Sequence, residues 1–336
     1  MREEPETLVV TRAEVARLLS PRDCRLALEE ALLRQAAGHV IPPGVLTLHL
    51  DEGGLHVKAA GLAGAGRVWV AAKCNANIPG NPERRSLPTI QGVIALFDGR
   101  TGSVLALLDS IEVTLLRTAA ATAVAARHLA VPDASLATIV GCGSQAPAQL
   151  RALCEVLPLA RVNAYDWREE QAAAFARTMC AEMEIDVIAV PDLTLATRES
   201  QVVVTCTPSR AAFLGREQVS PGTFVAAVGA DHPEKSEIAP GLMAASRVVV
   251  DVLSQCEAMG DLHHAIAAGV MSRDAVHAEL HEVVAGTKSG RVDSEEVVVF
   301  DSTGSALADV AAAALVYERA LASNAGRKID LQGGPW

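Results

Sequence analysis

The sequence predicts an α/β protein in which a doubly wound parallel sheet is joined to a second, α+β part. Three observations carry this prediction. Residues from about 135 to 303 alternate short apolar runs with helical segments, the pattern of βαβ units. Most of these runs are β-branched and apolar on both faces, as strands covered by helices on each side should be. Residues 1 to about 130 mix helices with strand-like runs and a turn-rich middle.

Length and composition narrow the function classes. The 336 residues fit two domains, which we expect at residues 1–130 plus 305–336 and at residues 131–304. The net charge of −11 disfavours nucleic acid and anionic membranes as partners, because both are bound by clustered Lys and Arg. No apolar run approaches the roughly 20 residues that span a bilayer. The start MREEPETLVV lacks the apolar region of an export signal, and the seven cysteines form no C-x-x-C pair. We therefore expect a cytoplasmic protein with reduced thiols and no metal site.

The first part begins with helices. Thr11, with Glu14 three residues later, indicates a capped helix, and a second helix is predicted near residues 22–37. Strands follow at 45–50, 55–60 and 68–73, and the segment 75–88, rich in Pro and Asn, is predicted as loop. The runs 92–97 and 104–109 flank DGRTG and indicate a hairpin. An Ala-rich helix is predicted at 112–130, where Pro132 stops it.

The second part contains the strands of the parallel sheet. They are predicted at residues 136–140, 161–165, 186–190, 202–205, 224–228, 248–252 and 297–300. Helices are predicted at 145–157 and 169–183. A last long helix at 305–321 should pack back on the N-terminal part.

The strongest local motif is LATIVGCGSQA, an apolar strand that leads into a glycine-rich turn and then a helix. It matches G-x-G-x-x-A, the dinucleotide-binding variant in a Rossmann-type domain. Gly141 would allow the tight turn, Gly143 the approach of a pyrophosphate, and Ala146 close packing of helix and strand. The helix N-terminus would bind the phosphates.

Asp166, in RVNAYDW, comes where a ribose-binding carboxylate belongs. A carboxylate there favours NAD(H) over NADP(H), because it repels a 2′-phosphate. Arg168 is close enough to keep NADP(H) as an alternative cofactor. The competing interpretation is that Asp166 only caps the next helix.

Other candidates lie at strand ends or among apolar residues. Asp231 directly follows VAAVGA, so its carboxylate could pass a proton to or from a substrate nitrogen near a bound nicotinamide. Lys73, Arg117 and Lys58 are cations flanked by apolar residues. Such cations can simply extend into water, but a guanidinium near a helix start also fits a carboxylate.

The combination of motifs resembles the ornithine cyclodeaminase/mu-crystallin family. The resemblance runs over nearly the whole chain. It is carried by KCNANIPGNPERRSLPTIQG with the hairpin and helix after it, VGCGSQA, VGADHPEKSE and DSTGSALADVAAAALVYERA. The family implies a Rossmann domain and a substrate-binding and dimerisation domain. Its shared chemistry is hydride transfer between nicotinamide and the α-carbon of an amino acid or its imine, and a homodimer is expected.

The resemblance also implies residue roles. Asp231 matches the catalytic acid or base, Lys73 binds substrate, Arg117 meets both substrate and cofactor, and Thr303 lies near the substrate. The matched cofactor contacts are Thr89, Gly141, Gly143, Ser144, Gln145, Asp166, Thr205, Val228, Lys235 and Ser302.

One departure from the family pattern bears on the substrate. Members that act as cyclodeaminases carry an arginine after a Pro-Pro pair, whereas this chain has Gly44 after Pro42 and Pro43. Lys58 would then replace the missing cation. We therefore expect a reductase of a small cyclic ketimine acid such as 1-pyrroline-2-carboxylate. The alternatives are an ornithine cyclodeaminase, an alanine dehydrogenase, and a mu-crystallin-like binding protein without catalysis.

Overall fold

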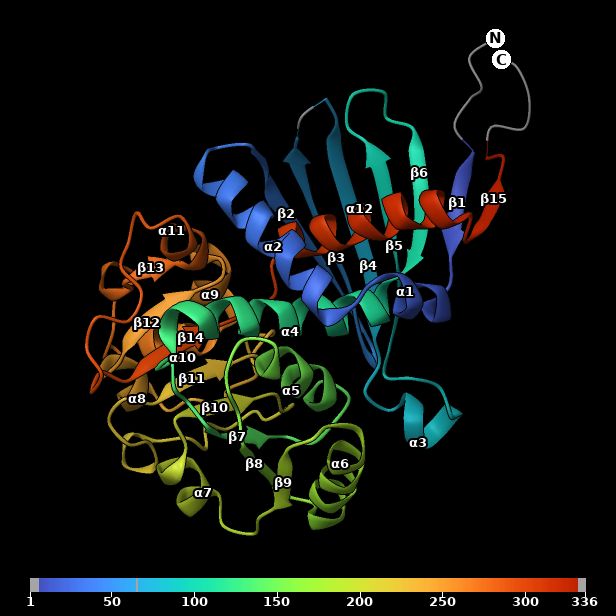
Figure 1. Cartoon of the computed structure of the whole chain (residues 1–336). Coiled ribbons are helices and arrows are strands. Elements are labelled where there is room, and N and C mark those ends of the chain that lie inside the picture. Colours follow the sequence, from blue (N-terminus) through green and yellow to red (C-terminus); the bar gives the residue numbers. More distant parts are fainter. Residues whose placement is uncertain (1–5, 65, 332–336) are drawn as a thin grey trace. The chain divides into compact units, whose positions relative to one another are not determined.

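The computed structural model describes residues 6–64 and 66–331, which form two compact units (Figure 1). Unit 1 takes its described residues from the ranges Met1–Arg117 and Ala306–Trp336, and unit 2 is Thr118–Ser305. The chain passes from unit 1 to unit 2 within helix α4 (Ser110–Leu129), whereas the sequence predicts that border at residue 130.

Unit 1 is built on a seven-stranded sheet. The strand order is β15-β1-β6-β5-β4-β3-β2, and β2 to β6 follow one another as antiparallel neighbours. The strands are β1 (Thr7–Val10), β2 (Val40–Leu50), β3 (Gly53–Ala63), β4 (Val68–Asn77), β5 (Ile90–Asp98), β6 (Val104–Asp109) and β15 (Arg327–Ile329). The predicted strands and hairpin are confirmed. The short β1 and β15 were not predicted, because they gain their apolar partners only by pairing with each other and with β6.

Two boundaries in unit 1 differ from the prediction. The loop predicted at 75–88 contains the end of β4 and the short helix α3 (Asn81–Arg85), which has Pro82 in its first turn, where proline fits a helix. Strand β2 starts five residues earlier than predicted and includes Pro42 and Pro43. It tolerates them because it is the edge strand and its register shifts between Ile41 and Gly44.

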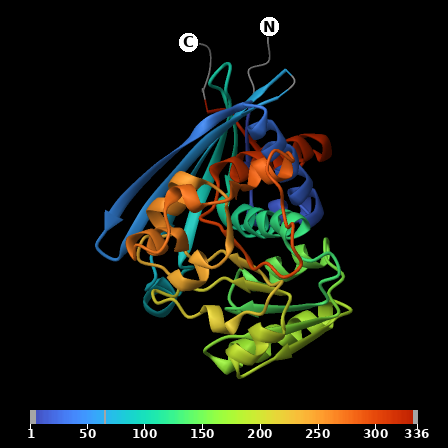
Figure 2. The same cartoon turned by 90° about the vertical axis from the view of Figure 1, so that its left-hand side faces the viewer.

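Helices cover one face of this sheet. The capped helix α1 (Arg12–Leu18) begins as predicted, with the Glu14 carboxylate accepting a hydrogen bond from the Thr11 amide at 2.9 Å. Helix α2 (Pro21–Ala36) and the last helix α12 (Ala306–Ser323) pack against each other, and both lie on β3. In Figure 2 the strands are seen nearly edge-on, with α2 and α12 on one side. The predicted return of the last helix to the N-terminal part is confirmed.

Unit 2 contains the predicted parallel sheet. All neighbouring strands are parallel, in the order β13-β12-β14-β11-β10-β7-β8-β9. The strands are β7 (Leu136–Val140), β8 (Arg161–Tyr165), β9 (Asp186–Ala189), β10 (Val202–Thr205), β11 (Phe224–Ala227), β12 (Arg247–Val250), β13 (Ala278–Glu279) and β14 (Val298–Asp301). Only the two-residue β13 was not predicted. The order reverses beside β7, and this is the point where doubly wound sheets bind ligands.

Helices connect the strands of unit 2. They are α5 (Ala146–Cys154), α6 (Glu169–Glu182), α7 (Leu193–Glu199), α8 (Pro240–Ala244), α9 (Leu253–Met259), α10 (Asp261–Ala267) and α11 (Leu280–Val284). The central strands β10, β11 and β14 are fully buried along their length, which explains their continuous apolar sequence. In the part of the chain that the structure describes, no helix combines the length and apolar character needed to cross a bilayer.

Candidate functional site

The glycine-rich turn between β7 and α5 adopts the predicted shape. Gly141 has φ +93°, and a Cβ there would lie 2.7 Å from the Thr207 side chain, so only glycine fits. A Cβ on Gly143 would meet no atom within 4 Å, so the backbone here borders open space. Ser144 is exposed, and α5 begins just after Gln145, with Pro147 in its first turn. Open backbone beside a helix N-terminus suits a phosphate.

The Asp166 carboxylate follows β8 and reaches back to this turn. Its Oδ2 accepts a hydrogen bond from the Cys142 amide at 2.9 Å, and its Oδ1 accepts one from the Arg168 amide at 3.0 Å. A carboxylate has about four acceptor positions, so capacity remains for ribose hydroxyls. The Arg168 Nε lies 3.9 Å from Oδ1, and this side chain is about half exposed. The geometry thus fits a ribose and keeps a cation close to it.

Glu237 is a buried acid that the sequence analysis missed. It connects the carboxyl ends of β10 and β11. Its Oε2 accepts hydrogen bonds from the Thr205 hydroxyl at 2.7 Å and the Gly229 amide at 2.8 Å. Its Oε1 accepts two from the amide and hydroxyl of Thr207, both at 2.7 Å. Burial and the nearby Asp261 raise the pKa of Glu237 to about 7. The hydroxyl of Thr205, a predicted cofactor contact, is therefore already bonded inside the unit.

Asp261 is a buried acid beside Glu237, and Asp301 is a third buried acid near Asp261. Asp261 Oδ1 accepts hydrogen bonds from the amides of Glu237 and Ile238 at 2.8 and 3.0 Å, and burial raises the pKa of Asp261 to about 6. Asp301 Oδ2 accepts one from the Leu262 amide at 2.9 Å. Burial and Asp261 raise the pKa of Asp301 well above its ordinary value. Within residues 6–64 and 66–331, no Lys or Arg side chain bonds to any of these three carboxyl groups.

The segment after β14 is held by another acid, Asp251. Its two carboxylate oxygens accept hydrogen bonds from the hydroxyls of Ser302 and Thr303 at 3.1 and 3.2 Å. It also accepts one from the Gly304 amide at 2.6 Å. Ser302 and Thr303 are both buried. Asp251 thus fixes the predicted cofactor contact Ser302 and the predicted substrate neighbour Thr303 at the end of their strand.

Asp231 lies just beyond the end of β11, in contrast to the buried acids. Its side chain is 52% exposed, and its Oδ1 lies 2.6 Å from the Lys235 Nζ. The half-buried Val228, between β11 and Asp231, donates its amide hydrogen to the Thr205 carbonyl at 2.9 Å. The predicted acid or base is therefore accessible and has a cation beside it.

Lys73 and Arg117 meet at a buried anion in unit 1. The Lys73 Nζ lies 3.0 Å from Oδ1 and 2.8 Å from Oδ2 of Asp309. The Arg117 Nε donates to the same Oδ1 at 3.0 Å, and Thr114 Oγ1 lies 3.4 Å from the ammonium. All three charged side chains are at most 8% exposed. Burial and Arg117 lower the pKa of Lys73 to about 7, against the opposing effect of Asp309.

Lys58 belongs to the same face of the sheet. In the antiparallel pair of β3 and β4 it lies directly opposite Lys73, and on its other side it faces Val45 of β2. Residues opposite each other on antiparallel strands share a face. Lys58 is half-buried, and its charge contributes to the lowered pKa of Lys73. The structure therefore brings Lys58, Lys73 and Arg117 together.

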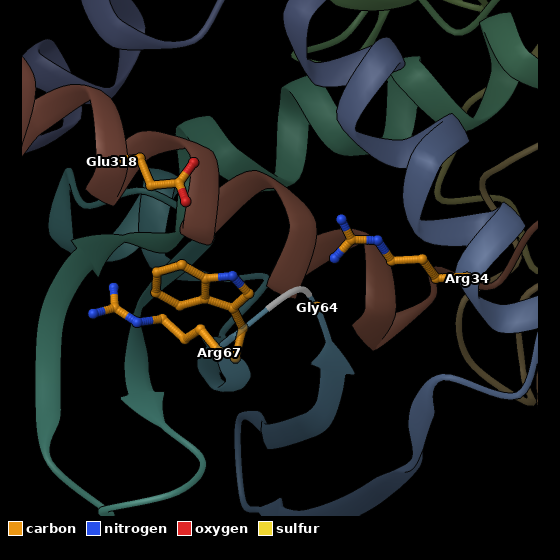
Figure 3. Close-up of a pocket in the computed structure, with 5 residues that line it drawn as sticks. Arg34, Gly64, Arg67 and Glu318 are labelled. Carbon is orange, nitrogen blue, oxygen red and sulfur yellow. The ribbon is translucent and has the colours of Figure 1, made fainter.

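Thr89 and a surface hollow lie elsewhere in unit 1. The Thr89 carbonyl accepts a hydrogen bond from the Ile78 amide at 2.8 Å and closes the loop that contains α3. The hollow in Figure 3 is lined by Arg34, Gly64, Arg67, Trp69 and Glu318. Arg67 stacks over the Trp69 ring at 4.8 Å. None of the predicted site residues lines this hollow.

Apart from Thr89, the site residues thus form one group in each unit, and the important omission in each group is an acid. Asp309 is the one charged residue in the run SALADVAAAALV, and a lone charge in an Ala-rich helix could have revealed it. Glu237 lies six residues after Asp231 among several polar residues, so its burial gave no local signal.

Comparison with known proteins agrees with the family resemblance that the sequence motifs indicated. The family model of the ornithine cyclodeaminase/mu-crystallin family matches residues 5–324. The chain is 39% identical to alanine dehydrogenase of Archaeoglobus fulgidus over 325 residues, 96% of this chain and 98% of the relative. It is 33% identical to iminosuccinate reductase of Paracoccus denitrificans over 96% of this chain and the whole relative.

Solved structures agree with these sequence relatives. A Δ1-pyrroline-2-carboxylate reductase of Thermococcus litoralis, solved with NADH and L-proline, superposes with a TM-score of 0.92 at 29% identity. The match covers 96% of this chain and all of the other. An archaeal alanine dehydrogenase dimer with bound NAD matches at a TM-score of 0.92 and 38% identity, over 97% of this chain and 99% of that one. The family model and these relatives show that the chain belongs to the ornithine cyclodeaminase/mu-crystallin family.

Proposed function

We propose that this protein is an NAD(H)-dependent oxidoreductase that reduces a small cyclic ketimine acid, such as 1-pyrroline-2-carboxylate, to the amino acid. The observation that carries the proposal is the group of Lys58, Lys73 and Arg117 on one face of the unit 1 sheet. A partly dehydrated cluster of this kind suits the carboxylate that every α-amino or α-imino acid carries.

Arg117 is suited to bind that carboxylate. It uses Nε for Asp309, and its two terminal nitrogens make no hydrogen bond to any described residue. Those nitrogens can grip a carboxylate in bidentate fashion. Lys73 adds a second charge, and Lys58 a third from the neighbouring strand.

Unit 2 supplies a site that fits the cofactor. Gly141, Gly143 and the start of α5 would hold the pyrophosphate, and Asp166 the adenosine ribose. When bound, the nicotinamide supplies a hydride to the imine carbon. The preference for NAD(H) over NADP(H) follows from the Asp166 carboxylate, and a matched kcat/KM comparison of the two cofactors tests it.

The reaction also needs one proton, because an imine, a hydride and a proton together give the amine. Protonation of the imine nitrogen makes the carbon more electrophilic. Asp231 would give or relay this proton, since its carboxyl group is accessible and Lys235 is beside it to fix its position. The acid or base need not be buried to act, provided that it reaches the nitrogen.

Two other reactions of the family remain as alternatives. Alanine dehydrogenase activity is favoured by the relative with 39% identity. It would use the same carboxylate clamp and the same proton, with ammonia and a keto acid in place of a cyclic imine. Ornithine cyclodeamination is disfavoured by Gly44, which stands where such members carry an arginine.

A single panel of assays separates these reactions. The purified protein is given NADH with 1-pyrroline-2-carboxylate, NADH with pyruvate and ammonium, and NAD with L-ornithine. We expect stoichiometric loss of NADH with the first. Turnover only with pyruvate and ammonium would establish the alanine dehydrogenase reaction, and ammonia release without net NADH would establish the cyclodeaminase. NADH binding without turnover on any substrate would contradict an enzymatic role and leave the binding protein.

We further propose that the protein is a homodimer. The face of the unit 1 sheet opposite Lys73 exposes large apolar side chains, including Leu46 at 55%, Leu48 at 47% and Val93 at 39%. A continuous apolar sheet face of this kind marks an interface, and one solved relative is an alanine dehydrogenase dimer. Light scattering at micromolar concentration should give twice the chain mass. Leu48→Glu should give the monomer mass.

A further inference from the structure

Asp309 is the shared anion of the cationic group in unit 1. It lies in the first turn of α12, whereas Lys73 is on β4 and Arg117 on α4. The carboxylate is 236 residues from Lys73 in the sequence and 192 residues from Arg117. Three elements distant in the sequence therefore converge on one carboxylate whose side chain is 2% exposed.

The bonds to Asp309 use only some of the N–H donors of Lys73 and Arg117. Arg117 contributes Nε, and its terminal nitrogens have no partner among the described residues. Lys73 contributes its ammonium, which has three N–H donors, to Asp309, with Thr114 nearby. Two cations and one anion leave a single net positive charge. The cluster is therefore still positive and still has donors for an anionic ligand.

We propose that Asp309 is a positioning residue, which holds Lys73 and Arg117 together, and Lys73 in its charged form, so that their remaining donors bind the substrate carboxylate. The inference rests on the proposed function, because that function supplies the anion. A carboxylate fixed in the protein aligns the two cations before the substrate arrives, so less ordering remains for the binding step.

The charges around Lys73 make this role measurable. Burial, Arg117 on α4 and Lys58 on β3 all lower the pKa of Lys73, whereas Asp309 on α12 raises it. Cys24 on α2 stays a neutral thiol, because burial raises its pKa to about 12, and β5 contributes the apolar Ile94 opposite Lys73. Asp309 is thus the one anion of the described residues that bonds to Lys73. Without it, the ammonium should lose its proton at lower pH.

The direct test is a titration of Lys73 in protein labelled with ¹³C-lysine, the Lys73 signal being identified by its loss in Lys73→Arg. In Asp309→Asn the midpoint should fall by about one pH unit or more, a tenfold or greater change in the proton equilibrium. Asp23→Asn is the matched control, because Asp23 pairs with Arg319 of the same helix α12 at 2.7 Å but does not contact Lys73. The midpoint should not move there.

Kinetics with 1-pyrroline-2-carboxylate give a second readout. In Asp309→Asn the high-pH decline of kcat/KM should shift to lower pH, and KM should rise more than kcat falls. Asp309→Glu keeps the charge and should recover part of the midpoint and of the KM. A Lys73 midpoint that stays in place in Asp309→Asn would overturn the proposal.

The proposal remains testable if Asp309→Asn does not fold. Because the coupling of two ionisable groups is reciprocal, removing Lys73 must affect Asp309. In Lys73→Met, with ¹³C-aspartate, the titration midpoint of the Asp309 carboxyl should rise, and an unchanged midpoint would overturn the proposal. Both titrations are read without substrate. If they succeed while all three assay reactions fail, the proposed function is wrong and the charge-holding role of Asp309 stands.

Discussion

The two units bury their acids in opposite ways. In unit 1, Asp309 meets two cations, and although burial acts to raise the pKa of Asp309, Lys73 and Arg117 hold it below its ordinary value. In unit 2, Glu237, Asp261 and Asp301 are buried among backbone amides and hydroxyls, and their pKa values are raised. A buried carboxyl with cationic partners remains charged, whereas one with only neutral donors is driven toward its protonated form. We infer that the first arrangement serves an anionic ligand and the second serves the geometry of the strand ends.

We expect the largest effect to be on kcat, and it should separate the exposed Asp231 of unit 2 from the buried acids of the same unit. Asp231→Asn keeps the size of the side chain and removes the proton, so kcat should fall by about 10²–10⁴. NADH binding, followed by its fluorescence, should persist. Glu237→Gln is the comparison, since Glu237 is fully buried and bonded within the unit. Near-normal turnover in Asp231→Asn, or a larger loss in Glu237→Gln, would move the proton role to the buried group.

The next largest effect is on the free energy of unfolding. It compares a buried acid that has cationic partners with one that has only neutral donors. Asp309→Ala leaves Lys73 and Arg117 without their shared anion, and breaking a buried ion pair costs about 3–5 kcal/mol. Asp301→Asn replaces a carboxyl that burial already drives toward neutrality, so we expect roughly 1 kcal/mol, the size of one altered hydrogen bond. Urea unfolding at pH 7 measures both free energies. Equal losses would remove the distinction between the two units.

Lys73 predicts a specific pH dependence. Its pKa is lowered to about 7 in the folded protein from an ordinary 10.5. Between these values the unfolded chain holds a proton that the folded protein has released, so stability rises with pH by up to about 1.4 kcal/mol per unit. Burial raises the pKa values of the Cys24, Cys206 and Cys256 thiols, and the window to measure is pH 7–8.5. Lys73→Met should lack this increase, and an identical slope in wild type and variant would contradict the assigned shift.

Glu237 predicts a change of stability with pH in the opposite direction. Its pKa rises to about 7 from an ordinary 4.5, so the folded protein keeps a proton that the unfolded chain has lost. Its contribution to stability is complete below 4.5 and disappears as the pH rises through 7. Burial also raises the pKa values of Asp261 and Asp301, so only the difference between wild type and Glu237→Gln is informative. The decline between pH 5 and 7 should be shallower in the variant.

The sequence predicted those parts of the site that depend on local pattern. Gly141 and Gly143 follow a buried strand and precede a helix, and Asp166 ends the next strand, so spacing alone located them. The strands of unit 2 were predicted for the same reason, since continuous apolar runs between helices are unambiguous. Lys73 and Arg117 were identified as cations among apolar residues, and the structure adds that they share a buried partner.

The parts that were missed depend on contacts between distant segments. Asp309 could be recognised as part of the site only from its ion pairs with Lys73 and Arg117, and no local sequence pattern links it to them. Glu237 is buried because Gly229 lets it approach: a Cβ there would lie 2.5 Å from the Glu237 carboxyl carbon. The strands β1 and β15 contain four and three residues and exist because Thr7 pairs with Ile329 and Leu8 with Ala106.

The origin of unit 1 from both ends of the chain has a consequence for synthesis. On the ribosome the chain emerges from its N-terminus, so Lys73 and Arg117 leave the exit tunnel long before Asp309 does. At ordinary elongation rates of about 5–20 residues per second, the 236 residues between Lys73 and Asp309 take roughly 10–50 seconds to appear. Most of unit 2 emerges during this interval, but its central strand β14 leaves the tunnel only just before α12. Until α12 is synthesised, Lys73 and Arg117 must remain hydrated. Unit 1, whose N-terminal segment is synthesised first, is therefore the last unit to be completed.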